Sequence, residues 1–228
     1  MSTNEIFKVS FSQLVKYWNA ENAIQRRGVI RTIFNPFGGN YYGEFNQAMK
    51  SYISGQQTDF SILERGLNQI DEARASATDP KEVKRLDSNH AILSNFMSIA
   101  PISFLEGVRF LELPAVLPRI EYGAISISVK PDILYTYQYR NRTYLGVIRF
   151  FITNDNLSEA IARFLVVILK EFTQMNFSNY GELRSRDCRL IDLNTGEIYS
   201  APDRTTRLRT RIIADCNEIE SLCRRFHE

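Results

Sequence analysis

The stretch SEAIARFLVVILKEFTQM, residues 158–175, is apolar on most sides of a helix. Ser158 suits the helix start, because its hydroxyl accepts a hydrogen bond from a free backbone N–H. A helix that is apolar on most sides is buried on most sides. We therefore expect it to lie between a β-sheet and a second layer, either the N-terminal helices or a second subunit. Arg163 and Lys170, seven residues apart, are expected to form one narrow exposed stripe.

Segments of strand character lie on both sides of this helix. Residues 120–129 alternate between apolar and polar side chains, the period-two pattern of a half-buried strand. Residues 132–139 and 144–153 are separated by a polar turn, which predicts a β-hairpin. A second strand–turn–strand is expected over residues 189–199, and a last helix over residues 203–226. The order is strand, strand, buried helix, strand, helix.

The first 98 residues are expected to be helical. The apolar spacing predicts helices over residues 11–18, 45–53 and 60–74. Asp79-Pro80 is a helix-start signal, and it predicts a fourth helix that runs through Phe96. Residues 31–43 contain Gly and Pro pairs typical of a loop. We expect an α+β protein in which a helical N-terminal region, residues 1–98, precedes an α/β domain, residues 99–228.

Composition narrows the range of partners. Lys and Arg total 28 against 26 Asp and Glu, so the net charge is +2 and no global field draws the chain to nucleic acid or anionic lipid. A nucleic-acid role would need a local basic patch. No apolar run approaches the length of a membrane span, and residues 1–16 lack a signal-peptide pattern. We expect no membrane association and a cytoplasmic location. Cys216 and Cys223 share one helix face and are expected to be buried free thiols.

One pair of motifs suggests chemistry. Pro131-Asp132 stands at the start of the first hairpin strand, and Val147-Ile148-Arg149 lies on the second. Metal-dependent phosphodiester cleavage uses carboxylates to hold Mg²⁺ and a cation near the scissile phosphate. One common arrangement places an Asp on one strand, and an acidic residue and a Lys two residues apart on the neighbouring strand. The acidic residue and the Lys then lie on the same face of their strand. In the simpler interpretation, Asp132 shapes a strand edge and Arg149 is an exposed residue opposite an acid.

Residues 120–175 resemble the core of the PD-(D/E)XK nuclease superfamily, in particular its RecB-like exonuclease domains. Pro131-Asp132 matches the family's Pro-Asp, residues 147–149 stand in place of its (D/E)-x-K, and residues 158–175 match the helix behind its site. The resemblance implies a restriction-endonuclease-like sheet with a buried central helix and a C-terminal helix. It also implies that Asp132, with Glu106 or Glu112 before the strands, would supply the metal ligands.

The chain departs from the family's pattern at the decisive positions. Val147 replaces the second metal ligand, and Arg149 replaces the Lys. An arginine holds phosphate through two parallel hydrogen bonds, but it does not give up a proton. Residues 160–170 also lack the Gln and Tyr of the RecB-type helix. The resemblance therefore implies a catalytically degenerate domain. Asp132 and Arg149 would be the remnants of its catalytic site, no cofactor is expected, and Mg²⁺ would be needed only by an active enzyme.

Basic residues supply candidates for nucleic-acid binding. Arg204, Arg207 and Arg211 are spaced three and four apart, which predicts a phosphate-binding stripe on one face of the last helix. Lys130, beside the Pro-Asp motif, is a further candidate. The neighbouring acids Asp203 and Asp215 favour instead a solvated face crossed by salt bridges.

Three tyrosines form the other candidate surface. Tyr135, Tyr137 and Tyr139 alternate along one strand and therefore share one of its faces. Tyrosine rings in such a row can stack on bases. Packing against the sheet or against a protein partner explains them equally well.

These features lead to one hypothesis with two alternatives. The leading hypothesis is a degenerate nuclease-like domain that binds nucleic acid or a protein partner; the resemblance places it in a bacterial defence or DNA-processing assembly. The first alternative is a protein-interaction or homo-oligomerisation module with no nucleic-acid role. The second is an active metal-dependent nuclease that takes its missing ligand from elsewhere, for example from Glu121. Convergence of Asp132, Arg149 and Glu106 or Glu112 in a cleft would favour nuclease ancestry.

Overall fold

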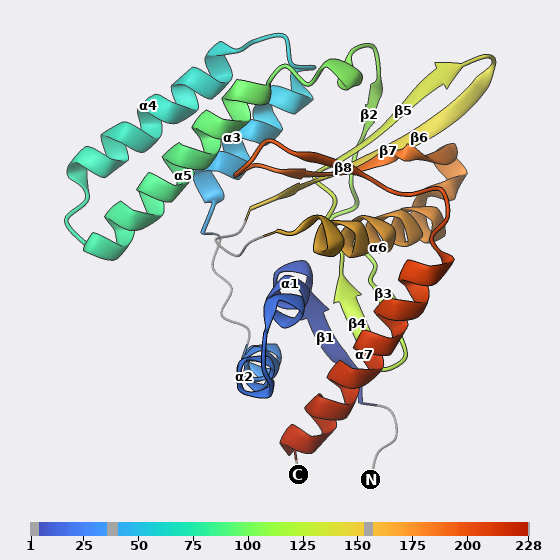
Figure 1. Cartoon of the computed structure of the whole chain (residues 1–228). Helices are drawn as coiled ribbons and strands as arrows, with labels where there is room; N and C mark the ends of the chain where they lie inside the picture. The colour runs from blue at the N-terminus through green and yellow to red at the C-terminus, as the bar shows by residue number, and fades with distance from the viewer. Residues whose placement is uncertain (1–4, 36–40, 153–156, 228) are drawn as a thin grey trace. The chain divides into compact units, whose positions relative to one another are not determined.

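The computed structural model describes residues 5–35, 41–152 and 157–227, and it has the predicted α+β class (Figure 1). The chain forms two compact units. The first unit contains Met1–Phe37, Arg109–Ile191 and Ile198–Glu228, and the second contains Gly38–Val108 with Asp192–Glu197. This division differs from the one expected at residue 98. The physical reason is that β1 (Phe7–Ser10) pairs in parallel with β4 (Ile125–Ser128), which makes the N-terminal segment part of a sheet in the first unit.

The larger sheet of the first unit has the strand order β2-β5-β6-β7-β8. Its members are β2 (Arg109–Leu111), β5 (Ile133–Tyr139), β6 (Arg142–Phe151), β7 (Glu182–Asp192) and β8 (Ile198–Ser200). β5 and β6 form the predicted hairpin, with Tyr139 opposite Arg142. Arg140 and Asn141 connect them at φ angles of 49° and 60°. Positive φ at both loop residues is what the type I′ hairpin turn requires.

The smaller sheet of the first unit has the order β1-β4-β3, and β3 spans Ile120–Tyr122. The single strand predicted over residues 120–129 was wrong, because this segment folds back on itself as β3 and β4. Ile120 lies opposite Ile127, and Tyr122 lies opposite Ile125. Gly123 at the turn has a φ of 61°, a left-handed conformation that glycine adopts without steric cost.

The helix α6 (Glu159–Phe177) is buried in the first unit, as its sequence predicts. Its N-cap is Ser158, whose Oγ accepts from the backbone N–H of Ile161. The run from 165 to 169 is fully buried. α6 contacts β6 and β8 on one side and β3, α1 (Phe11–Asn19) and α7 (Thr206–His227) on the other (Figure 1). The second layer over α6 therefore comes from the same unit.

Lys170 on α6 does not lie on an exposed stripe, and that prediction was wrong. Its side chain is buried, and its Nζ donates to Ser185 Oγ at 2.8 Å and to the Pro202 carbonyl oxygen at 3.3 Å. Arg163 is exposed as expected and pairs with Glu159 at 2.7 Å. Helical spacing puts the two residues on nearly the same face, but β7 and the segment after β8 supply the oxygens at the Lys170 end only.

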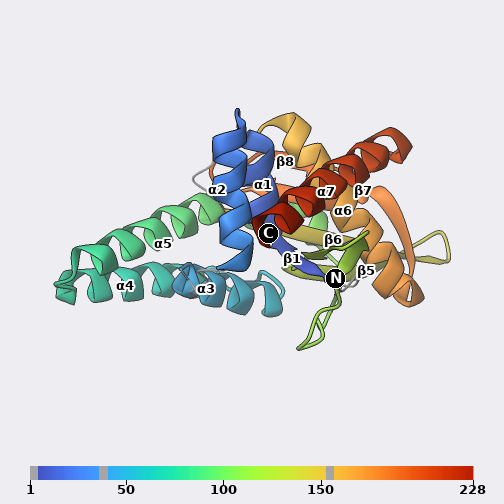
Figure 2. The same cartoon turned by 90° about the horizontal axis from the view of Figure 1, so that it is seen from below.

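The N-terminal helices α1 and α2 (Ala23–Phe34) and the last helix α7 pack around the smaller sheet of the first unit (Figure 2). Trp18 Nε1 on α1 donates to the buried carboxylate of Asp215 on α7 at 3.0 Å. Cys216 and Cys223 are buried in α7 and free, which confirms that prediction. α2 was not predicted, and residues 31–34, expected in a loop, are helical. Its apolar pattern is weak, because its buried side chains are those of Ile30 and Ile33.

The second unit is built from α3 (Gly43–Ser54), α4 (Ser61–Ser76), α5 (Pro80–Ile99) and the short 3₁₀ helix η1 (Ser103–Leu105). α5 begins as predicted, because Asp79 caps it by accepting from the Lys81 N–H. A Cβ on Gly66 of α4 would lie 2.8 Å from the Ala48 Cβ of α3, so glycine permits the close approach of these helices. No helix within the described residues is long and apolar enough to cross a bilayer.

Candidate functional site

Asp132 lies immediately before β5, at the end of the β5–β6 hairpin that is away from its turn. Its backbone N–H donates to the Ile148 carbonyl oxygen at 2.9 Å, which fixes the residue in the strand pair. Leu134 and Val147 belong to the core that also contains α6. Because side chains alternate along a strand, Asp132 and Arg149 continue the α6-facing side of the sheet.

Arg149 closes on the Asp132 carboxylate. Its Nη1 lies 3.0 Å from Oδ1 and 3.0 Å from Oδ2, and the Phe150 backbone N–H donates to Oδ2 at 2.8 Å. The two side chains are 27% and 11% exposed, so the ion pair is shielded from water on most sides. Both oxygens of the expected metal ligand are thus engaged by Arg149. The arrangement holds two strands together and leaves little of the carboxylate for a cation.

The other metal candidates form no metal-binding cluster with Asp132 in the part of the chain that the structure describes. Val147, at the position of the second ligand, is fully buried in the core and offers no donor atom. Glu112 is exposed in the segment after β2, Glu121 is exposed on β3 in the smaller sheet, and Glu106 belongs to the second unit. Within the described residues, no group of three His, Cys, Asp or Glu side chains is placed to hold a metal ion. The convergence that would favour nuclease ancestry is therefore limited to Asp132 and Arg149.

The predicted arginine stripe on the last helix is only partly realised. Arg207 and Arg211 lie one turn apart on α7, whereas Arg204 precedes the helix, which begins at Thr206. Arg211 pairs with Asp215 at 3.0 Å, so a salt-bridged face describes this end of the stripe. Lys130 is exposed between β4 and β5.

A row of tyrosines occupies the face of the larger sheet opposite to α6. Tyr137 stacks on Tyr144 of the neighbouring strand with ring centroids 5.5 Å apart, and Tyr135 lies 6.4 Å from Tyr137. Tyr135 is buried over Gly146, where any Cβ would overlap its ring, and burial raises its pKa above the usual range. Exposure increases along the row towards the hairpin turn, and Tyr139 at its end is 47% exposed. The predicted common face is confirmed, but only its outer end is open to a ligand.

Arg184 of β7 lies over this row. Its guanidinium carbon is 3.8 Å from the centroid of Tyr144, 5.2 Å from that of Tyr137 and 5.8 Å from that of Tyr139. Cations in this position are attracted by the negative face of the ring. Buried Asp187 fixes the guanidinium from below, because its Oδ2 accepts from Arg184 Nε at 3.0 Å and from the Tyr137 hydroxyl at 2.6 Å. The result is a preorganised surface of rings and one clamped cation.

The side chains of β7 do not alternate regularly between the two faces of the sheet. Ser185 and Cys188 turn towards α6, where they contact Lys170 and the Val166 carbonyl. Arg184 and Asp187 turn to the tyrosine face. Both pairs are three residues apart, so the alternation of side chains is interrupted in this part of β7.

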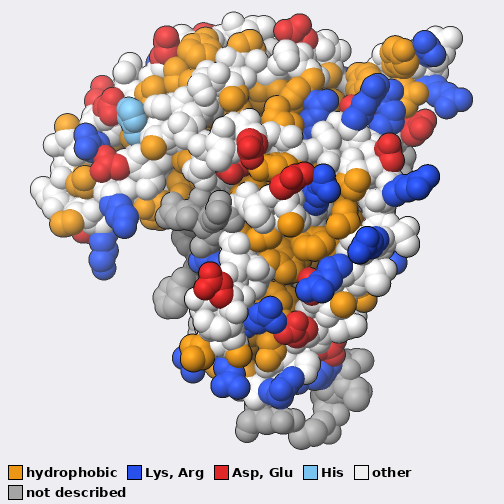
Figure 3. Space-filling model, viewed as in Figure 1, with side chains coloured by type: hydrophobic (Ala, Val, Ile, Leu, Met, Phe, Trp, Pro, Cys, Tyr) orange, Lys and Arg blue, Asp and Glu red, His pale blue; other side chains and the backbone are white. Residues whose placement is uncertain are grey.

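Two further arginines lie at the exposed end of the row. Arg140 stacks on Tyr139 at 5.2 Å, and Arg142 lies opposite Tyr139 on β6 and is exposed. Residues 137–144 and 180–189 together contain five arginines and two acids. Basic and hydrophobic side chains gather at the tip of this hairpin (Figure 3). We call Tyr137, Tyr139, Tyr144, Arg140, Arg142 and Arg184 the Tyr–Arg surface.

The sequence points to the tyrosines of β5 but not to their partners. Tyr144 is detectable, because a two-residue turn at 140–141 sets Tyr137 opposite it. Arg184 and Asp187 carry no such signal, since the helix α6 separates their strand from the hairpin along the chain. No family model matches the chain, and no curated protein is significantly similar to it.

Proposed function

We propose that this protein binds single-stranded nucleic acid through the Tyr–Arg surface and does not cleave it. The observation that carries the proposal is the Tyr139 ring, which is 47% exposed and has the guanidinium groups of Arg140 and Arg184 at 5.2 and 5.8 Å. An exposed aromatic ring can stack on an unpaired base whatever its identity, and nearby arginines hold the adjoining phosphates. A base that stacks on a protein side chain must be unpaired and accessible, which favours single strands over duplex.

The local charge supports this partner although the overall charge is nearly balanced. Five arginines against two acids in the segments that form the surface give it a local excess of positive charge. One acid, Asp187, is buried and already bound to Arg184 and Tyr137. The other, Glu182, lies 3.8 Å from Arg142 in an exposed pair that contributes little. Arg140 is exposed beside Tyr139 and can reach the phosphate next to a stacked base.

The arrangement at Asp132 supports binding without cleavage. A magnesium site for phosphodiester hydrolysis uses carboxylate oxygens that are free to bind the ion. Both oxygens of Asp132 accept hydrogen bonds from Arg149, and one also accepts from the Phe150 N–H. The pair lies on the α6-facing side of the sheet, whereas the tyrosine row lies on the opposite face. Binding and the remnant of a nuclease-like site are therefore separate features in this proposal.

Fluorescence anisotropy with a labelled oligothymidylate of about twenty nucleotides tests the proposal. The double variant R140Q/R142Q should bind more weakly, and the slope of log K against log salt should become shallower by about 1.4, since each single-strand phosphate contact contributes about 0.7. The matched control R204Q/R207Q removes the same charge near the start of α7. It should bind like the wild type.

A protein-interaction module without a nucleic-acid role, the alternative, predicts no binding of the oligonucleotide. In that case neither the wild type nor the variants bind the oligonucleotide at physiological salt. Weakening by R204Q/R207Q instead of R140Q/R142Q would move the nucleic-acid site to the stripe on the last helix.

A further inference from the structure

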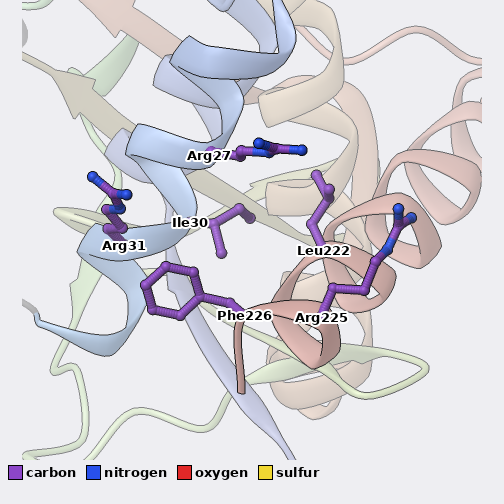
Figure 4. Close-up of a pocket in the computed structure, with 6 residues that line it drawn as sticks. All are labelled: Arg27, Ile30, Arg31, Leu222, Arg225 and Phe226. Atoms are coloured by element: carbon purple, nitrogen blue, oxygen red, sulfur yellow. The ribbon is translucent and has the colours of Figure 1, made fainter. Parts of the chain in front are cut away.

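A separate feature of the first unit is a pocket of about 290 Å³ between α2 and α7. It is lined by Arg27, Ile30, Arg31, Leu222, Arg225 and Phe226 (Figure 4). This volume corresponds to about ten water molecules. It stands near the lower end of the range for ligand pockets, about 300–1,000 Å³. The pocket therefore fits one compact molecule.

The floor of the pocket is apolar. Ile30 is buried and Leu222 is half-buried. The ring of Phe226 stacks on Phe34 with centroids 5.3 Å apart and an interplanar angle of 12°, which holds it in place although it is 47% exposed. Figure 4 shows these three lining side chains side by side beneath the level of Arg27. Such a floor favours a flat or compact apolar group.

The rim of the pocket is cationic. On α2, Arg26 pairs with Glu218 at 2.7 Å, and on α7, Arg224 pairs with Glu220 at 2.8 Å. Arg27 and Arg225, the next residue in each helix, line the pocket instead, and no acidic group among the described residues pairs with either.

The two rim arginines are placed to act together. Arg225 is positioned by Ser221, whose Oγ accepts from its Nη2 at 3.0 Å. In Figure 4, Arg27 reaches from α2 towards α7, and the guanidinium of Arg225 rises on the same side.

From this combination we infer that the pocket binds a small organic anion, a phosphate ester of a compact aromatic group. Two guanidinium groups suit a phosphate, because charge-assisted hydrogen bonds to it are short and strong. The apolar floor adds the burial of a ring, which an inorganic ion lacks. The inference does not rest on the proposed nucleic-acid binding, since it concerns other residues and a ligand of different size.

Isothermal titration calorimetry on the full chain provides the test, with phenyl phosphate, inorganic phosphate and benzyl alcohol as the three probes. Phenyl phosphate carries both the anion and the ring, and each other probe carries one of them. We expect phenyl phosphate to bind at least about tenfold more tightly than inorganic phosphate, and benzyl alcohol to give no measurable heat.

Variants assign the two parts of the site. R27Q and R225Q should each weaken phenyl phosphate by about tenfold, and Phe226→Ala should weaken phenyl phosphate but not inorganic phosphate. R204Q/R207Q removes two exposed arginines near the start of α7, at the other end of the helix from the pocket. It should leave the affinity for phenyl phosphate unchanged. Unchanged melting temperatures of the variants would show that they are folded.

Several results would overturn the inference. Equal binding of phenyl and inorganic phosphate would remove the role of the apolar floor. Equal binding of benzyl alcohol and phenyl phosphate would remove the role of the arginines. Absence of phenyl phosphate binding at millimolar concentration, or binding unaffected by R27Q and R225Q, would remove the site itself.

Discussion

Arg149 donates from a single nitrogen, Nη1, to both carboxylate oxygens of Asp132, and each nitrogen–oxygen distance is 3.0 Å. The pair joins β6 to the residue that precedes β5, and the Phe150 N–H adds a third hydrogen bond to the same carboxylate. The Asp132 carboxylate, which we expected to bind a metal ion, instead binds the arginine of the neighbouring strand. Its hydrogen bonds therefore serve a structural role.

We predict that the purified protein does not cleave DNA or RNA in the presence of Mg²⁺ or Mn²⁺. The reason is that Val147 is buried without a donor atom and Asp132 is engaged by Arg149. The measurement is gel electrophoresis of labelled single- and double-stranded substrates after prolonged incubation. Cleavage that Asp132→Ala abolishes would contradict this prediction and restore the active-nuclease alternative.

A double-mutant cycle should reveal the structural contribution of the same pair. Asp132→Asn and Arg149→Met should each lower the free energy of unfolding, because each leaves a partly buried charge without its partner. The coupling energy between them should be about 1–3 kcal/mol, as for residues within one hydrogen-bonded network. Urea unfolding of the wild type, both single variants and the double variant measures it. Additive effects would show that the contact contributes no net stability.

Truncation of α6 should show how firmly its apolar side chains are packed. Leu165→Ala and Ile168→Ala remove fully buried side chains and should each cost about 2–5 kcal/mol. Arg163→Ala removes an exposed residue in an i,i+4 pair and should change stability by less than about 0.5 kcal/mol. Thermal unfolding of the three variants compares them. Equal and small effects would show that the helix is peripheral.

The cysteines of α7 should react slowly with thiol reagents in the native state. Burial raises the pKa values of Cys216 and Cys223 to about 12, so the reactive thiolate is scarce at pH 8. Labelling with Ellman's reagent should proceed at the rate of unfolding and become fast in denaturant. Immediate labelling of both thiols without denaturant would contradict their placement on the buried face.

Local pattern predicts the elements of this fold better than their partners. The helix over residues 158–175 and its Ser158 cap followed from composition and spacing, because the helix itself determines them. Lys170 was misplaced because the oxygens that receive its ammonium belong to Ser185 and Pro202, and helical spacing carries no information about them. β1 was missed for a similar reason, since four residues give a weak pattern and its partner β4 begins only at Ile125.

The candidate site divides in the same way. Strand alternation predicts the common face of Tyr135, Tyr137 and Tyr139. Arg149 lies in β6 as expected, and Asp132 directly precedes β5. How far each tyrosine is exposed depends on Gly146 and on what covers the sheet. The place of Arg184 depends on an interruption of the side-chain alternation in β7, which the pattern of a regular strand does not predict.

The measurement that tests the central claim most directly is the affinity of Tyr139 variants for a labelled single-stranded oligonucleotide. Tyr139→Phe keeps the ring beside Arg140 and Arg184, whereas Tyr139→Ala removes it. Base stacking contributes about 1–3 kcal/mol, so Tyr139→Ala should weaken binding by about 5- to 150-fold while Tyr139→Phe binds like the wild type. Equal affinity of all three proteins, or no binding by the wild type at physiological salt, would contradict the account.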